Sequence, residues 1–115
     1  MNVYQAFFSL KDGVHDQDFC RELRVYMEYL KERGDLVSWR LLRKKLGLAP
    51  KEYGEFQLIM EFEGLDKLDQ AFRFVATREG DVEEKHYAVN QHIQNVTFSL
   101  YRDYPDPERT GKGLF

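Results

Sequence analysis

Three features are scarce in this sequence: cysteine, long apolar runs and an excess of one charge. The 115-residue chain has a single cysteine, Cys20, which excludes an intrachain disulfide and a cysteine zinc site. The apolar runs span only a few residues, too few for a membrane-spanning helix. The first residues, Asn2-Val3-Tyr4-Gln5, lack the basic and apolar regions of a signal peptide. We therefore predict a cytoplasmic protein without a membrane partner.

Charge and histidine content exclude two further classes of protein. The net charge is −3 with both signs interspersed, so no broad attraction to phosphate backbones is expected, and we predict no nucleic-acid partner. The three histidines, His15, His86 and His92, lack the close spacing of a metal site. We predict neither a metal nor a cofactor.

The hydrophobic pattern is that of a globular domain with strands and helices. Apolar residues alternate in four segments, which predicts strands at residues 2–10, 36–46, 54–63 and 95–101. Helical spacing predicts a first helix, capped by Asp16 or a neighbour and ending at Gly34, on the stripe Phe19, Leu23, Tyr26, Met27 and Leu30. A second helix is predicted from Asp66 to near Gly80, and a shorter helical segment on the stripe Val82, His86, Val89 and Ile93. Cys20 is expected to be buried in the first helix.

This order, β-α-β-β-α-β, predicts an α+β protein of ferredoxin-like fold. Right-handed crossovers give a four-stranded antiparallel sheet with the helices on one face. We predict one domain at residues 1–104 and a C-terminal tail at residues 105–115, whose polar part from Glu108 to Phe115 is mobile or lies on a partner. Pro105 and Pro107 end the last strand.

The two faces of the predicted sheet differ in polarity, but both are partly apolar. The helix-facing sets are Tyr4/Ala6/Phe8/Leu10, Val37/Trp39/Leu41, Phe56/Leu58/Met60/Phe62 and Val96/Phe98/Leu100. The other face carries Val3, Gln5, Phe7, Arg40, Leu42, Gln57, Ile59, Glu61, Thr97, Ser99 and Tyr101. About half of this second set is aliphatic or aromatic, which is typical of an interaction surface rather than of a sheet facing water.

A second copy packed sheet on sheet would cover this open face, so we predict a homodimer. The mixed polar and aromatic side chains would then line a cavity between the two sheets, as in a small-molecule site. The candidate ligand-binding residues are Gln5, Phe7, Arg40, Gln57, Glu61 and Tyr101. For Arg40 and Glu61 two interpretations stay open, which are ligand binding and an interfacial ion pair that sets the dimer register.

Three stretches carry a resemblance to a known superfamily. They are Ser38-Trp39-Arg40-Leu41-Leu42-Arg43, Gly54 to Glu61, and His86-Tyr87-Ala88-Val89-Asn90 leading to Phe98-Ser99-Leu100-Tyr101-Arg102-Asp103. With the element order, they make residues 2–103 similar to the dimeric α+β barrel superfamily, which includes stress-responsive A/B barrel proteins and small antibiotic-biosynthesis-type monooxygenases. The last stretch resembles a group of uncharacterised bacterial ferredoxin-like proteins.

The resemblance implies a fold more than an activity. Monooxygenases of this type can act without metal or flavin, and some relatives bind haem, but no complete active-site set of either kind matches this sequence. Our leading hypothesis is a homodimer that binds a small organic molecule, with cofactor-independent monooxygenase-like chemistry left open. The alternative is a non-catalytic structural or stress-associated dimer.

His86 is the one candidate catalytic residue. It lies on the apolar stripe before the last strand, where an imidazole near a cavity would be a general base. The competing interpretation, which the absence of a recognisable partner carboxylate favours, is a core histidine bonded to a backbone carbonyl.

Overall fold

The chain forms one four-stranded sheet and three helices in the computed structural model, which describes residues 1–77 and 80–105. The elements are β1 (Asn2–Leu10), α1 (Asp16–Glu32), β2 (Ser38–Arg43), β3 (Phe56–Phe62), α2 (Leu65–Ala76), α3 (Gly80–Asn90) and β4 (Ile93–Arg102). The predicted α+β class and ferredoxin-like order are confirmed. All but one residue of the predicted tail lie outside the described residues.

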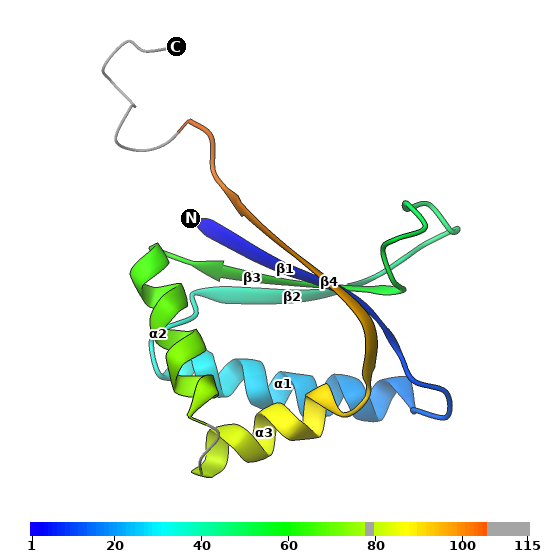
Figure 1. Ribbon diagram of the computed structural model, residues 1–115, viewed down its shortest axis with the longest axis horizontal. Helices are drawn as coiled ribbons and strands as arrows, with labels where there is room; N and C mark the ends of the chain where they lie inside the picture. Colours follow the sequence, from blue (N-terminus) through cyan, green and yellow to red (C-terminus); the bar gives the residue numbers. More distant parts are fainter. Residues whose placement is uncertain (78–79, 106–115) are drawn as a thin grey trace.

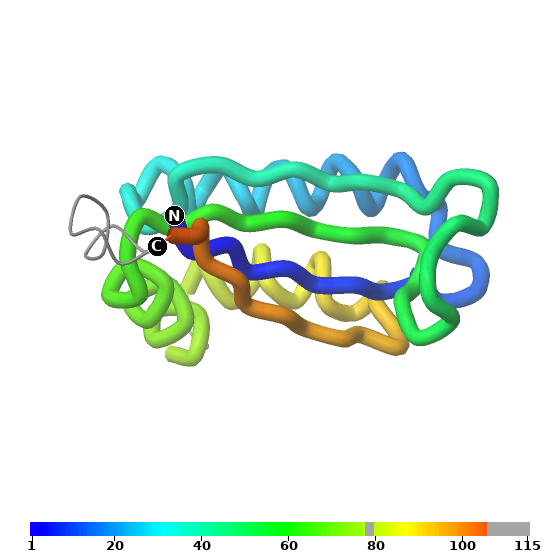
Figure 2. The backbone as a smooth tube through the Cα atoms, turned by 90° about the horizontal axis from the view of Figure 1, so that it is seen from above, coloured from blue at the N-terminus to red at the C-terminus, as the bar shows by residue number. Residues whose placement is uncertain are grey.

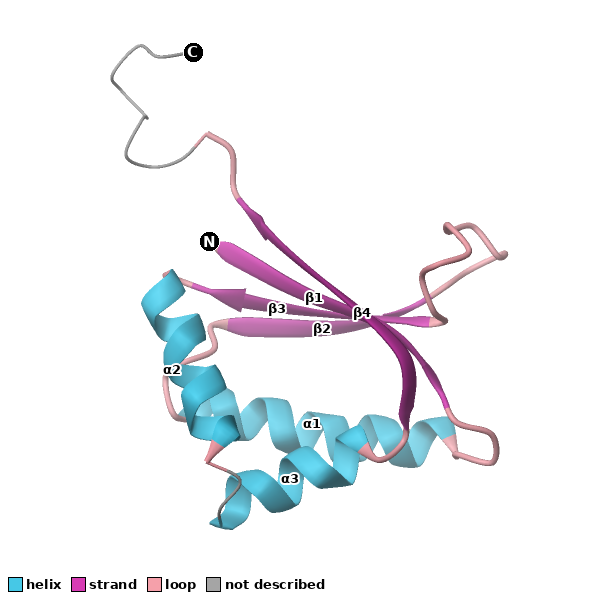
Figure 3. Ribbon diagram, in the orientation of Figure 1, coloured by secondary structure: helices cyan, strands magenta, loops and turns pink. Residues whose placement is uncertain are grey.

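The sheet is antiparallel, with the strand order β2-β3-β1-β4. Ala6 of β1 lies opposite Leu58 of β3 on one side and opposite Phe98 of β4 on the other, so these three residues share a face. Seen from above, the four strands lie over α1 and α3 (Figure 2). On this face α1 and α3 lie side by side, α2 runs from the end of β3 down towards α3, and the other face is open (Figures 1 and 3).

The apolar stripe of α1 makes the centre of the core. Phe19, Leu23, Tyr26, Met27 and Leu30 are all buried, as the helical spacing predicts. They pack with Phe8 and the inward set of β3, of which Phe62 is fully buried. The helix ends before Gly34, whose φ of +87° is left-handed and favours glycine.

The second strand faces the helices with the predicted residues. Trp39 and Leu41 pack against the core, and the Trp39 indole Nε1 donates to Glu28 Oε1 of α1 at 3.4 Å. Val37 is an exception because it precedes the strand and remains 40% exposed. The strand also stops at Arg43, since residues 44–46 belong to the following loop.

Several expectations at the edges of elements were wrong. The N-cap of α1 is His15, a neighbour of Asp16 as expected, but it makes no side-chain capping bond. Cys20 is partly exposed rather than buried, because it lies at the border of the apolar stripe. Ile93 starts β4 and is not part of a helix.

The inward residues of β4 differ most from expectation. Val96, Phe98 and Leu100 share the helix side of the sheet but remain 43%, 56% and 52% exposed. β4 is an edge strand of the sheet, and α3 packs mainly on α1 and also contacts α2. The described helices include none long and apolar enough to cross a membrane.

Candidate functional site

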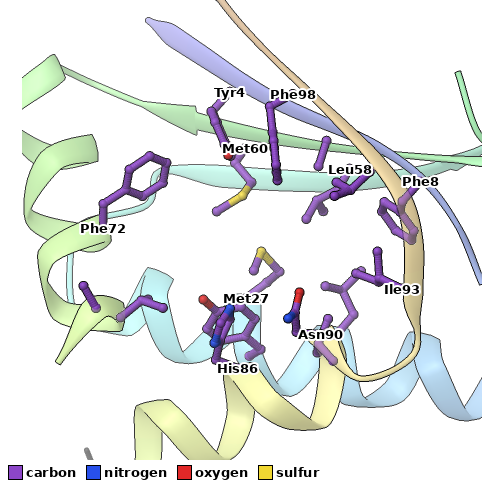
Figure 4. A pocket seen from close by; sticks show the side chains of 17 residues that line it. Tyr4, Phe8, Met27, Leu58, Met60, Phe72, His86, Asn90, Ile93 and Phe98 are labelled. Atoms are coloured by element: carbon purple, nitrogen blue, oxygen red, sulfur yellow. The ribbon is translucent and has the colours of Figure 1, made fainter. Parts of the chain in front are cut away.

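A cavity of about 410 Å³ lies between the sheet and the helix layer. The sheet wall comes from β1, β3 and β4 and includes Ala6, Leu58 and Phe98. The helix wall comes from all three helices (Figure 4). Phe98 of β4 lines this cavity and remains 56% exposed.

Aromatic rings border the cavity near β4 and α2. Tyr4 stands edge-on to Phe72 of α2, with ring centroids 5.1 Å apart, and stacks with Phe98 of β4 at 5.6 Å. Phe72 is 42% exposed, so this side of the cavity is open to solvent. A flat apolar ligand would therefore find aromatic faces here.

Polar groups gather on the helix wall opposite these rings. Tyr26 of α1 and His86 and Asn90 of α3 line the cavity, and the last two are one helical turn apart. Figure 4 shows His86 and Asn90 on the wall that faces the sheet. No lysine, arginine or carboxylate lines the cavity among the described residues. The site is thus apolar on the sheet side and carries neutral hydrogen-bonding groups on the helix side.

His86 has the carboxylate partner that the sequence analysis did not identify. Its Nδ1 lies 3.9 Å from Glu83 Oε2, and its ring centroid is 5.8 Å from that of Tyr26. The Glu83 oxygen is buried and accepts no hydrogen bond from the described residues. The spacing of three residues on a helix is the signal that could have revealed this pair. A histidine with one nitrogen towards a carboxylate can turn the other towards a ligand.

The side chain of Tyr26 is a phenol that lies beside His86. Burial raises its pKa far above the ordinary value of 10.0, and the negative charge of Glu83 and the nearby Tyr4 add to the rise. Burial also raises the pKa of Tyr4. Both phenols are protonated at neutral pH, as tyrosines ordinarily are, and the raised pKa values extend this to more alkaline pH, so the hydroxyl groups can donate hydrogen bonds.

The predicted ligand residues lie on the opposite face of the sheet from this cavity. Gln57 donates to Gln5 across β1 and β3, and Glu61 accepts from Ser38 Oγ at 3.0 Å. Phe7 stacks on Tyr53, with ring centroids 4.3 Å apart, while Arg40 and Tyr101 are exposed. Of all the predicted site residues, the structure brings only His86 to the cavity between sheet and helices. A site between two sheets stays a prediction.

Tyr26 and Asn90 are site residues that the sequence analysis missed. Tyr26 was assigned to the core because it lies on the apolar stripe of α1. Asn90 follows His86 by four residues on α3, which places both on one helix face. This spacing predicts that His86 and Asn90 share a helix face. It does not predict how far α3 lies from the sheet.

The remaining histidines lie apart from the cavity. His92 Nε2 is 3.2 Å from Glu22 Oε2, and His15 Nδ1 is 3.8 Å from Asp18 Oδ2. Within residues 1–77 and 80–105, no three His, Cys, Asp or Glu side chains are grouped so that they could hold a metal ion.

Comparison with known proteins places the fold among characterised structures. The model of a family of unknown function, DUF6614, matches residues 1–113, and no curated protein matches the chain. At3g17210 from Arabidopsis thaliana is similar in structure, with a TM-score of 0.72, 12% identity and coverage of 90% of this chain and 95% of that one.

Two further structures show the same fold. SnoaB of Streptomyces nogalater, described as a cofactor-independent oxygenase, has a TM-score of 0.68 and 10% identity over 92% of this chain and 95% of its own. A dimeric ferredoxin-like protein of unknown function from Jannaschia sp. CCS1 has a TM-score of 0.67 and 8% identity over 89% and 98%. The fold-level resemblance inferred from the sequence is thereby confirmed.

We expect a Tyr26→Phe substitution to change how stability depends on alkaline pH. Because the folded pKa lies above the unfolded one, the phenol contributes stability that is fully present below about pH 10 and is lost as the pH rises towards the folded pKa. The wild type should lose up to about 1.4 kcal/mol per pH unit more than the variant above pH 10. Urea unfolding between about pH 9 and pH 11 measures this difference, and parallel curves for the two proteins would contradict it.

Proposed function

The chain belongs to the DUF6614 family of unknown function, and we propose that it binds a small, mostly apolar organic molecule in the cavity between its sheet and its helices. The observation that carries this proposal is the cavity itself. Its volume of about 410 Å³ falls within the range of small-molecule sites, and an apolar lining with a few convergent polar groups is their usual composition.

The lining indicates what kind of molecule would fit. The sheet wall offers aromatic and aliphatic surface, and the helix wall offers the Tyr26 hydroxyl, the His86 imidazole and the Asn90 amide. An anionic ligand would lose its hydration without gaining a lysine or arginine, and Glu83 behind His86 would repel it. A neutral, flat molecule with a hydroxyl or carbonyl group on one edge satisfies both walls.

A more specific form of this proposal is that the protein also catalyses a reaction of the bound molecule. His86 is the candidate base because a carboxylate lies behind it and a ligand hydroxyl could lie in front of it. The similarity in fold to SnoaB, an oxygenase described as cofactor-independent, is compatible with such chemistry. Fold similarity alone does not transfer an activity, so ligand binding is tested first.

Filling the cavity should abolish binding of an apolar probe. Ala76 lies at the end of α2, lines the cavity and is exposed, so Ala76→Trp would occupy the cavity with little strain on the core. We expect the variant to bind the fluorescent probe N-phenyl-1-naphthylamine at least about tenfold more weakly than the wild type. Gln70→Trp, an exposed position on α2 outside the cavity, is the control. Equal affinity of all three proteins would refute a site in this cavity.

The role of His86 can be tested with two ligands that differ by one hydroxyl. We expect 2-naphthol to displace the probe better than naphthalene does, and His86→Gln to reduce that advantage by about fivefold to tenfold. The thermal midpoint should shift by only a few degrees, because the amide keeps much of the polar volume. A core histidine would instead cost about 1–3 kcal/mol of stability. A destabilised variant with an unchanged preference for 2-naphthol would remove His86 from the site.

We further propose that the protein is a homodimer through the open face of the sheet. Ile59 and Leu42 lie half-buried on this face, and Phe7 and Tyr53 form an aromatic stack on it. The Jannaschia protein of the same fold is described as dimeric. A non-catalytic dimer is the alternative function that this face supports, and probe binding separates the two. A cytoplasmic location and a stress-associated role stay predictions from the sequence.

An Ile59→Lys substitution tests the dimer. A two-fold axis would bring two new positive charges to one desolvated interface, at a cost on the order of 3 kcal/mol. We expect a dimeric mass for the wild type at micromolar concentration and a monomeric mass for the variant by sedimentation. A monomeric wild type would refute the dimer without affecting the cavity proposal.

A further inference from the structure

The loop between β2 and β3, residues 44–55, is anchored firmly at its base. The Lys44 N–H donates to Glu55 O at 2.7 Å, and Lys44 Nζ donates to Tyr53 O at 3.1 Å. Gly54 lies against the end of β1, where an added Cβ would be only 2.3 Å from the Phe8 carbonyl carbon. The return leg of the loop is thus held over β1.

The tip of this loop presents two leucines to solvent. Leu46 is 90% exposed and Leu48 is 79% exposed. Leu46 also has a left-handed φ of 56°, which is uncommon for a leucine, and Gly47 follows with a φ of 66°. The positive φ values belong to a turn that is closed by the Leu48 N–H, which donates to Lys45 O at 3.0 Å, whereas the two leucine side chains stay largely exposed. A leucine tip of this kind indicates an interaction with something outside the chain.

The loop projects towards the open face of the sheet. Figures 1 and 3 show it rising on the side away from the helices, and Figure 2 shows it reaching across the ends of neighbouring strands. Tyr53 of the loop stacks on Phe7 of the open face. Leu48, Tyr53, Phe7, Leu42 and Gln57 border one hollow of about 590 Å³. The leucine tip and the open face therefore form one continuous surface.

We propose that this loop is a clasp, and that Leu46 and Leu48 pack on the open face of a second copy of the chain. This inference rests on the proposed homodimer and adds to it the segment that grips the partner. A two-fold interface uses the clasp twice, once from each copy.

The distribution of charge indicates which end of the second copy the loop would contact. The loop carries Lys44, Lys45 and Lys51 against Glu52 and Glu55, a small positive excess, whereas Glu61 and the exposed Glu63 lie at the opposite end of the sheet. If the two-fold axis of the dimer ran along the strands, the 44–55 loops of the two copies would lie at the same end, with their positive charges close together. An axis across the strands places each basic loop at the acidic end of the other copy, which is electrostatically favourable.

A fluorescent label on the tip tests the clasp. The full chain would carry Cys20→Ser and Leu48→Cys labelled with bimane, with Val25→Cys, an exposed site on α1, as the matched control. We expect the label at position 48 to be shielded from iodide in the dimer and to become quenchable after dilution or after Ile59→Lys. The label at position 25 should not change.

The outcomes distinguish the clasp from the dimer. A dimer whose label at position 48 is fully quenchable overturns the clasp and leaves the dimer intact, whereas a monomer at every concentration refutes both. Burial of the label in phosphatidylglycerol vesicles, with no protection in the dimer, would show that the tip binds a lipid surface and also overturns the proposal.

Charge exchange tests the orientation. Lys45→Glu with Lys51→Glu should weaken the dimer about tenfold. Adding Glu61→Lys and Glu63→Lys to the same chain should restore it, because each loop again meets the opposite charge. If the fourfold variant dimerises more weakly than the double variant, the loops do not lie at the acidic ends.

Discussion

The packing of α3 against α1, rather than against β4, is the contact on which the candidate site depends. Val82 and Val89 of α3 are almost completely buried beside the stripe of α1. Burying these two side chains stabilises α3 by several kcal/mol, roughly 1.5–3 for each. Because α3 packs against α1, it does not cover the inward side of β4. The cavity, the exposed Phe98 and the access to His86 all follow from this choice.

The proposed ligand site and the proposed dimer interface lie on opposite faces of the sheet. On the helix side, β1 contributes Tyr4 and Ala6 to the cavity, and on the open side it contributes Gln5 and Phe7 to the proposed interface. Alternation along a strand makes this division possible, because successive side chains point to opposite faces. A ligand in the cavity and a second copy on the open face would therefore not compete for the same residues.

The polar groups of the cavity also depend on one another. Burial is the main cause of the raised pKa of Tyr26 and the charge of Glu83 adds to it, while Glu83 Oε2 also lies 3.9 Å from His86 Nδ1. Since Glu83 sits behind them and does not line the cavity, its charge acts on the site without being exposed to a ligand. This charge favours a neutral ligand over an anionic one.

By itself, the sequence determined the elements, the strand faces and the place of His86 on an apolar helical stripe. These depend on local periods of two and 3.6 residues, which is why Trp39 and the stripe of α1 were predicted correctly. Only the tertiary structure decided that α3 packs beside α1, that β4 is left uncovered, and that Tyr26, His86 and Asn90 meet in one cavity. Periodicity states which residues share a face, but the separation of two layers depends on how side chains from distant segments fill the space between them.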